Sequence, residues 1–285
     1  MKIATVGKGG SGKTTLAGIL ARLLAAEGKR LLAIDGDPNP NLALMLGLAP
    51  EQANGIACIP PSVMEIRESG GQRRLAMTLS PDELISRYAV TARDGISLIV
   101  MGKPAEGSAG SGCMCAAHRA VRGLIQEMSD FGDHTITDME AGLEHLKRGT
   151  ASSVDVMLIV AEPYYRSLEA AARTYSLARE LRIPHLYVVA NKVSGDSDRS
   201  AIEIFCTSHD MPLIGVVPVE PTFVEAERAG GSPIDSAPQS AGVLAIAAIA
   251  RRLEALAVAG ERGPDAALAT GELRKVVKPQ ANLAS

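Results

Sequence analysis

The chain has 285 residues, and its 29 lysine and arginine residues against 32 aspartate and glutamate residues leave a formal net charge of −3. A chain without a basic excess lacks the positive field that holds a nucleic-acid backbone, so nucleic acid is not an expected partner. No run of 18 apolar residues is present, and the first residues lead into a strand pattern without a charged leader. We therefore expect a cytoplasmic protein with no membrane partner.

Short apolar runs recur along the chain and alternate with alanine-rich and leucine-rich stretches of helical spacing. Strands are expected at 2–6, 30–34, 96–101, 134–137, 154–160, 186–190 and 213–217. Helices are expected at 13–26, 116–128, 168–181 and 241–256. This alternation predicts an α/β fold: one doubly wound domain with a mainly parallel sheet and helices on both faces.

Two segments depart from this alternation. Residues 49–95 carry Pro60, Pro61, Gly70 and Gly71 among polar residues, and we interpret them as an inserted, partly helical excursion. After Leu256 the sequence is rich in glycine, proline, alanine and charge and shows no sustained apolar periodicity. The expected organisation is thus one domain over 1–258, followed by a flexible C-terminal tail over 259–285.

Residues 7–14 read G-K-G-G-S-G-K-T, a complete Walker A motif between an expected strand and an expected helix. The glycines let backbone N–H groups face phosphates, and the helix start adds its positive end. Lys13 would reach the β and γ phosphates, and Thr14 would offer its hydroxyl to Mg²⁺. The motif predicts ATP/ADP and Mg²⁺ as ligands, with nucleotide contacts from Gly9, Gly10, Ser11, Gly12, Lys13, Thr14 and Thr15.

Lys8 directly follows the first glycine of the motif. The sequence K-G-G-S-G-K-T-T resembles the deviant Walker A family, which holds the nitrogenase iron protein, the Min and Par positioning ATPases and metallocentre maturation ATPases. In that family the signature lysine reaches the nucleotide of the partner subunit. The resemblance implies a homodimeric ATPase (ATP and water to ADP and phosphate) with Lys8 and Lys13 as catalytic residues. A cation supplied in trans is worth roughly 10³ to 10⁵ in rate.

Acidic residues follow two of the expected strands. Asp35 and Asp37 lie in I-D-G-D-P-N-P-N, at the carboxyl end of a parallel strand, where doubly wound sheets place ligands. The resemblance implies that Asp37 positions or activates the attacking water, whereas for Asp35 a turn or capping role stays open. Asp138 ends T-I-T-D at the Walker B position and would hold Mg²⁺ together with Thr14. Residues 139–149 would then form switch II.

Asn191 ends the strand sequence L-Y-V-V-A-N. The resemblance implies that its amide bonds the adenine ring and that Pro218 and Val219 flank the base. An ordinary turn role for Asn191 at the strand end stays open.

Four cysteines in a chain of this length form no disulfide framework, but Cys113 and Cys115 lie two apart before an expected helix. Thiols near a helix start bind metals readily. Two thiolates cannot complete a four-coordinate site, whereas a two-fold axis would bring four together from two subunits. Zn²⁺ suits tetrahedral thiolates and Ni²⁺ square-planar ones. An incidental pair stays open, and Cys58 and Cys206 are expected to be packing residues.

The C-x-C loop, together with D-P-N-P-N and D-M-E-A-G-L-E-H-L, resembles the CooC-type accessory ATPases that insert nickel into carbon monoxide dehydrogenase. This resemblance implies a Ni²⁺ or Zn²⁺ site of Cys113 and Cys115 at the dimer interface and a client metalloenzyme such as carbon monoxide dehydrogenase. It also implies a metallochaperone that couples ATP hydrolysis to nickel insertion.

Two alternatives remain. The first is an ATP-dependent iron–sulfur reductase with an interface cluster, which residues 139–149 disfavour because they contain no cysteine. The nitrogenase iron protein and its reductase relatives hold a [4Fe–4S] cluster with one cysteine before switch II and a second within it, and His145 stands near the place of that second cysteine. For His145, as for His118, a solvated or capping role is favoured over ligation. The second alternative is a Min-like or Par-like positioning ATPase, for which a C-x-C loop has no use.

Overall fold

The computed structural model describes residues 1–69, 72–101, 132–140 and 154–261. Within these residues an eight-stranded sheet runs in the order β10-β9-β8-β1-β7-β2-β6-β5. Every neighbouring pair is parallel except β5 with β6. The strands are β1 (Lys2–Gly7), β2 (Leu31–Asp35), β5 (Val90–Thr91), β6 (Ser97–Val100), β7 (His134–Asp138), β8 (Val156–Ala161), β9 (His185–Val193) and β10 (Leu213–Pro218).

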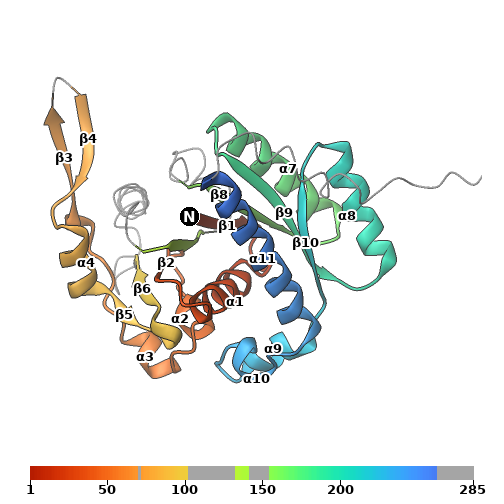
Figure 1. Ribbon diagram of the computed structural model, residues 1–285, viewed down its shortest axis with the longest axis horizontal. Coiled ribbons are helices and arrows are strands. Elements are labelled where there is room, and N and C mark those ends of the chain that lie inside the picture. The colour runs from red at the N-terminus through yellow and green to blue at the C-terminus, as the bar shows by residue number, and fades with distance from the viewer. Residues whose placement is uncertain (70–71, 102–131, 141–153, 262–285) are drawn as a thin grey trace, which may run out of the picture.

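Helices cover both faces of this sheet. Figure 1 shows α1 (Lys13–Ala26) and α11 (Ala241–Glu261) side by side across one face. The short α2 (Leu42–Met45) packs there as well, and its Leu42 is fully buried in the same core cluster as Ile3 of β1. The next strand residue, Ala4, belongs to the opposite core, under α4 (Pro81–Tyr88), α7 (Tyr165–Glu180) and α8 (Asp196–Ser208). Both faces are therefore apolar, as a parallel sheet requires.

The predicted α/β architecture is confirmed, with strands at all the expected places and helices at 13–26, at 165–180 where 168–181 was expected, and over 241–256. The expected helix at 116–128 lies outside the described residues. Helix α8 was not expected because its sequence is largely polar and, among its residues, only Ile202 and Cys206 are buried. A single narrow apolar contact line leaves a weak periodic signal.

The segment 49–95 contains more strand than its sequence suggested. Besides α3 (Pro50–Asn54) and α4 it holds the hairpin β3 (Met64–Ser69) and β4 (Gln72–Met77), which projects from the body of the protein (Figure 1). Met77 at its base is buried in the core, whereas Ile66 is 52% exposed. The domain bounds 1–258, the insert and the tail over 259–285 stay predictions, and the tail lies outside the described residues from 262 on.

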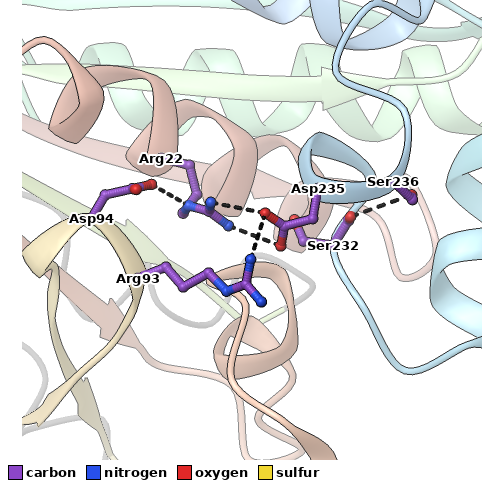
Figure 2. A network of polar contacts seen from close by, with 6 residues as sticks. All are labelled: Arg22, Arg93, Asp94, Ser232, Asp235 and Ser236. Carbon is purple, nitrogen blue, oxygen red and sulfur yellow. Dashed lines mark hydrogen bonds and ion pairs between the residues drawn. The ribbon is translucent and has the colours of Figure 1, made fainter.

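A buried arginine ties α1 to two distant segments (Figure 2). The Arg22 guanidinium donates to both carboxylate oxygens of Asp235, on α10 (Pro233–Ser236), over 3.2 and 3.0 Å. Its Nε donates to Asp94 in the turn η2 (Arg93–Gly95), and Arg93 reaches Asp235 over 3.2 Å. Burial disfavours the Asp235 carboxylate, but the hydrogen bonds and charges of Arg22 and Arg93 together outweigh burial and lower the pKa of Asp235. The cluster fastens the insert and α10 to α1.

The topology places several loops at one edge of the sheet. Strand β1 lies between β7 and β8, so the chain leaves its carboxyl end at the point where strand order reverses. Crevices at such switch points hold ligands in open α/β sheets. The short α9 (Pro221–Arg228) follows β10 nearby. None of the helices that the structure describes is long and apolar enough to cross a membrane.

Candidate phosphate and magnesium site

The loop between β1 and α1 has a backbone that only glycine fits at two positions. Gly7 has φ 153°, and a Cβ there would lie 2.5 Å from the Val160 carbonyl oxygen. Gly12 has φ 93°, and a Cβ there would lie 2.3 Å from Asn191 Nδ2. Gly12 is also the N-cap of α1 and offers no side chain to its first amides. The start of the helix is therefore suited to an anion.

Lys13 lies along this loop rather than in solvent. Lys13 is 6% exposed, and its Nζ donates to the Lys8 carbonyl oxygen over 3.4 Å. The same oxygen accepts from the Ser11 backbone N–H over 3.2 Å, which closes the loop into a tight curl. A buried ammonium inside a curl of backbone amides is the arrangement that binds a triphosphate.

Three oxygen-bearing side chains meet where α1 starts and β7 ends. The Thr14 hydroxyl donates to Asp138 Oδ2 over 2.6 Å, and the Thr5 hydroxyl donates to Asp138 Oδ1 over 3.1 Å. Hydroxyl and carboxylate oxygens are the ligands that Mg²⁺ prefers. The predicted pair of Thr14 and Asp138 is thus brought together, and its chemistry fits Mg²⁺.

Two buried carboxylates lie next to each other on β2 and β7, where Asp35 pairs with Asp138. Burial raises the pKa of Asp138 to about 6, although hydrogen bonds from Thr14 and Thr5 and the charge of Lys13 oppose this rise. Burial, followed by the charge of Asp138, raises the pKa of Asp35 to about 7. A cation beside Asp138 would relieve this concentration of negative charge, which also supports a metal site here.

The loop after β2 is held by Asp35. Its carboxylate accepts the backbone N–H of Leu42 over 2.9 Å and that of Asp37 over 3.2 Å, so Asp35 acts in the turn and at the start of α2. Asp37 is half-buried, accepts the Asn39 backbone N–H over 2.8 Å, and contributes to the raised pKa of Asp138. Asp37 is therefore near the candidate magnesium site, and its role with water stays a prediction.

The residues expected around the base come together between β9 and β10. Asn191 Nδ2 donates to the Ser11 carbonyl oxygen over 2.6 Å, so in this structure the amide holds the phosphate loop. Pro218 ends β10, and the backbone N–H of the half-exposed Val219 donates to Val193. A small pocket beside them is lined by Thr15, Leu16, Val160, Asn191, Val217 and Phe223. Adenine contacts of Asn191, Pro218 and Val219 stay predictions.

Three residues at this edge were not singled out from the sequence. Glu162 follows β8, and its carboxylate accepts from Lys192 Nζ over 2.9 Å and from the Tyr164 hydroxyl over 2.6 Å. Lys192 also donates to the Gly10 carbonyl oxygen over 2.6 Å. An acid directly after a buried strand was the available signal, because it is the same signal that marked Asp35 and Asp138.

The candidate cysteine site lies outside the part of the chain that the structure describes. Cys113, Cys115, His118, His145 and most of 139–149 lie outside the described residues. Within the described residues no group of three or more histidine, cysteine, aspartate or glutamate side chains could hold a metal ion. Cys206 is buried in the core, where burial raises the pKa of its thiol to about 11, and Cys58 is half-buried against the other core.

Comparison with known proteins agrees with this geometry. Residues 2–234 match the family described as the CobQ/CobB/MinD/ParA nucleotide binding domain. The chain belongs to this family. It is therefore a nucleotide-binding ATPase.

Individual relatives indicate which type of ATPase within the family the chain resembles. The chain is 38% identical over 244 residues to the carbon monoxide dehydrogenase accessory protein CooC of Rhodospirillum rubrum, covering 84% of this chain and 91% of that protein. An uncharacterized ATP-binding protein of Methanocaldococcus jannaschii is 36% identical over 81% of this chain and 90% of its own length. The chain is thus a deviant Walker A ATPase of the CooC type.

Solved structures show the same fold. The septum site-determining protein MinD complexed with Mg-ADP from Pyrococcus horikoshii superimposes with a TM-score of 0.68 at 20% identity, covering 90% of this chain and 96% of that one. At this identity the likeness concerns the fold alone.

Proposed function

We propose that the chain is a homodimeric maturation factor that couples ATP binding and hydrolysis to nickel insertion into a metalloenzyme such as carbon monoxide dehydrogenase. The observation that carries this proposal is the 38% identity to a carbon monoxide dehydrogenase accessory protein over 91% of its length. The C-x-C pair Cys113 and Cys115 adds a chemical reason, because two pairs of thiolates across a two-fold axis form a four-coordinate site.

ATP would bind across the loop 7–14. The backbone from Gly9 to Gly12 would face the phosphates, and Lys13, whose Nζ lies against the Lys8 carbonyl oxygen, would neutralise them. Thr15 and Asn191 line the small pocket beside the loop, toward the base. Thr14 and Asp138 would hold Mg²⁺, which when bound neutralises charge on the phosphate oxygens.

Hydrolysis would need both subunits. Asp37, near Asp138, would orient the attacking water and take up its proton. Lys8 is exposed at the outer side of the loop, where it would reach the nucleotide of the partner subunit. Turnover would then depend on dimerisation, and loss of the γ phosphate would change switch II (139–149), which follows the cysteines. This links nucleotide state to metal held by Cys113 and Cys115.

Anaerobic purification followed by metal analysis tests this function. The metal content per dimer and the apparent mass are measured with and without ATP, for the natural chain, for a Cys113→Ala, Cys115→Ala double variant, and for Cys58→Ser as a matched control. One Ni²⁺ or Zn²⁺ per dimer that is lost in the double variant and kept in the control supports the proposal. If metal never binds while ATP still drives dimerisation, the chaperone role is wrong and the ATPase switch stands.

A positioning ATPase is the second candidate, since MinD of Bacillus subtilis is 26% identical over 88% of this chain. Co-sedimentation with liposomes and with DNA, with and without ATP, separates the two. ATP-dependent co-sedimentation of a metal-free protein would favour positioning. A brown, iron-containing dimer from the same anaerobic purification would instead favour the iron–sulfur reductase.

A further inference from the structure

The ring of Tyr164 lies beside the signature lysine of its own subunit. Tyr164 directly precedes α7, and Lys8 Nζ is 5.2 Å from the centroid of its ring. That separation is within the range of a cation–π contact. Lys8 is exposed and Tyr164 is 43% exposed, so the contact sits at the open rim of the phosphate loop.

The ring is fixed by a chain of hydrogen bonds that returns to the same loop. The Tyr164 hydroxyl donates to Glu162 Oε2 over 2.6 Å, and Glu162 Oε1 accepts from Lys192 Nζ over 2.9 Å. Lys192 Nζ in turn donates to the Gly10 carbonyl oxygen over 2.6 Å. Glu162 is 8% exposed, so its carboxylate at the centre of this bridge is shielded from water, whereas the Lys192 side chain is 48% exposed. The tyrosine and the loop that carries Lys8 are therefore held in one frame.

The backbone on both sides supports this frame. Lys192 has φ 57°, a left-handed conformation that is unfavourable for a residue with a Cβ and persists only where its surroundings fix it. The Tyr164 carbonyl oxygen accepts the N–H groups of Ser167 and Leu168, and the Ser167 hydroxyl accepts the Glu162 N–H over 3.0 Å. Tyr164 is thus placed by main-chain contacts as well as by its hydroxyl.

The backbone carbonyl and the side-chain ammonium of Lys8 contact different neighbours. Its carbonyl oxygen accepts from Lys13 Nζ and from the Ser11 N–H inside the loop, whereas its ammonium lies against Tyr164. A free lysine side chain samples many rotamers, and a ring beside its ammonium reduces that number before a partner arrives.

We propose that Tyr164 is a positioning residue for Lys8. Its ring holds the ammonium at the outer side of the phosphate loop, pre-organised to reach the nucleotide of a second copy of the chain. Glu162 and Lys192 keep the ring in register with the loop. This inference rests on the proposed function, in which Lys8 acts in trans.

Kinetics of matched tyrosine variants test the inference. Tyr164→Leu removes the ring, Tyr164→Phe removes only the hydroxyl, and Tyr165→Leu changes the neighbouring tyrosine, which is 68% exposed and bonds Glu169 instead. The expected result is a kcat for ATP about two- to fivefold lower in Tyr164→Leu, which is the size of an exposed cation–π contact. The KM for ATP should stay unchanged, and Tyr165→Leu should retain nearly full rate. Tyr164→Phe keeps the ring but loses its bond to Glu162, so its kcat should lie between those of Tyr164→Leu and the natural chain. Equal rates for Tyr164→Leu and Tyr165→Leu would overturn the inference.

A second background separates positioning from general damage. In a Lys8→Ala chain, Tyr164→Leu should have no further effect, because the group that it positions is missing. The same fractional loss in both backgrounds would mean a structural role for Tyr164 and would refute positioning.

A spectroscopic readout keeps the inference independent of the ATPase assay. In protein with lysine labelled with ¹³C at Cε, the Lys8 signal, assigned by its loss in Lys8→Ala, should be shifted upfield by the ring. The shift should persist in Tyr164→Phe and vanish in Tyr164→Leu. An unshifted Lys8 signal in the natural chain contradicts the inference. If Lys8→Ala keeps full ATPase activity while the shift is present, the trans role of Lys8 is wrong but the contact with Tyr164 is real.

Discussion

The Thr14 hydroxyl donates to the Asp138 carboxylate over 2.6 Å, which joins the first turn of α1 to the end of β7. Residues 124 positions apart in sequence thereby present two oxygens to one point at the edge of the sheet. With the curl of the phosphate loop beside them, these oxygens are where a nucleotide-bound Mg²⁺ would be coordinated.

Removal of the Thr14 hydroxyl should weaken the binding of Mg²⁺ at this site. Thr14→Val keeps the shape of the side chain and removes the hydroxyl, so ATPase activity at fixed Mg²⁺ should fall by roughly 100-fold, the typical effect of losing one preorganised polar group. Thr5→Val removes the other hydrogen bond to Asp138 and should have a much smaller effect. ATPase rates measured against Mg²⁺ concentration check this, and equal curves for Thr14→Val and the natural chain would refute the assignment.

The two lysines of the loop should separate binding from turnover. Lys13→Ala should abolish tight ATP binding, because the buried ammonium inside the curl is lost. Lys8→Ala should still bind ATP with nearly natural affinity while kcat falls by roughly 10³. Fluorescence titration with a labelled nucleotide gives the affinity, and phosphate release gives the rate. Loss of binding in Lys8→Ala would show that Lys8 belongs to its own subunit's site.

Acid should destabilise the fold partly through His134. Its side chain is 4% exposed, and burial lowers its pKa although Glu254, 2.7 Å away, opposes the shift. Because the pKa of His134 is lower in the folded state than its ordinary value of 6.5, the folded state takes up this proton less readily than the unfolded state. The free energy of unfolding is therefore fully retained above pH 6.5 and falls as pH drops below it. In urea titrations His134→Gln should reduce the loss of unfolding free energy below pH 6.5, by at most about 1.4 kcal/mol per pH unit. An unchanged slope would contradict this.

The arginine cluster of Figure 2 should contribute to stability unevenly. Asp235→Asn removes one of two acidic partners from Arg22, whose side chain is 8% exposed, and should cost about 1–3 kcal/mol of unfolding free energy. Arg93→Ala removes the outer member, whose side chain is 59% exposed, and should cost under about 1 kcal/mol. Urea unfolding of both variants measures the difference, and equal costs would mean that burial of Arg22 is unimportant.

The sequence predicts whatever depends on neighbours along the chain. The strand at 2–6, the loop 7–14 and the helix at 13–26 follow one another, and their patterns are enough to predict both fold and phosphate site. The hairpin of β3 and β4 was missed because its residues 64–77 alternate polar and apolar side chains irregularly, with Gly70 and Gly71 between the strands and Pro60 and Pro61 just before them.

Contacts between distant segments were also missed. The bridge from Lys192 through Glu162 to Tyr164, and the pairing of Arg22 with Asp235, depend on how strands and helices meet in space. Local propensity carries no information on such pairings. Only the rule that ligands gather at the carboxyl ends of parallel strands pointed toward Glu162.

Complementation between two inactive chains tests the shared active site most directly. Lys8→Ala retains Asp37, and Asp37→Asn retains Lys8, so in a mixed dimer the site on the Lys8→Ala subunit has its own Asp37 and receives Lys8 from its partner. Each variant alone should be nearly inactive, whereas an equimolar mixture should regain about a quarter of the natural ATPase rate, since half of the dimers are mixed and each has one complete site. A mixture no more active than its components would contradict action of Lys8 across the dimer.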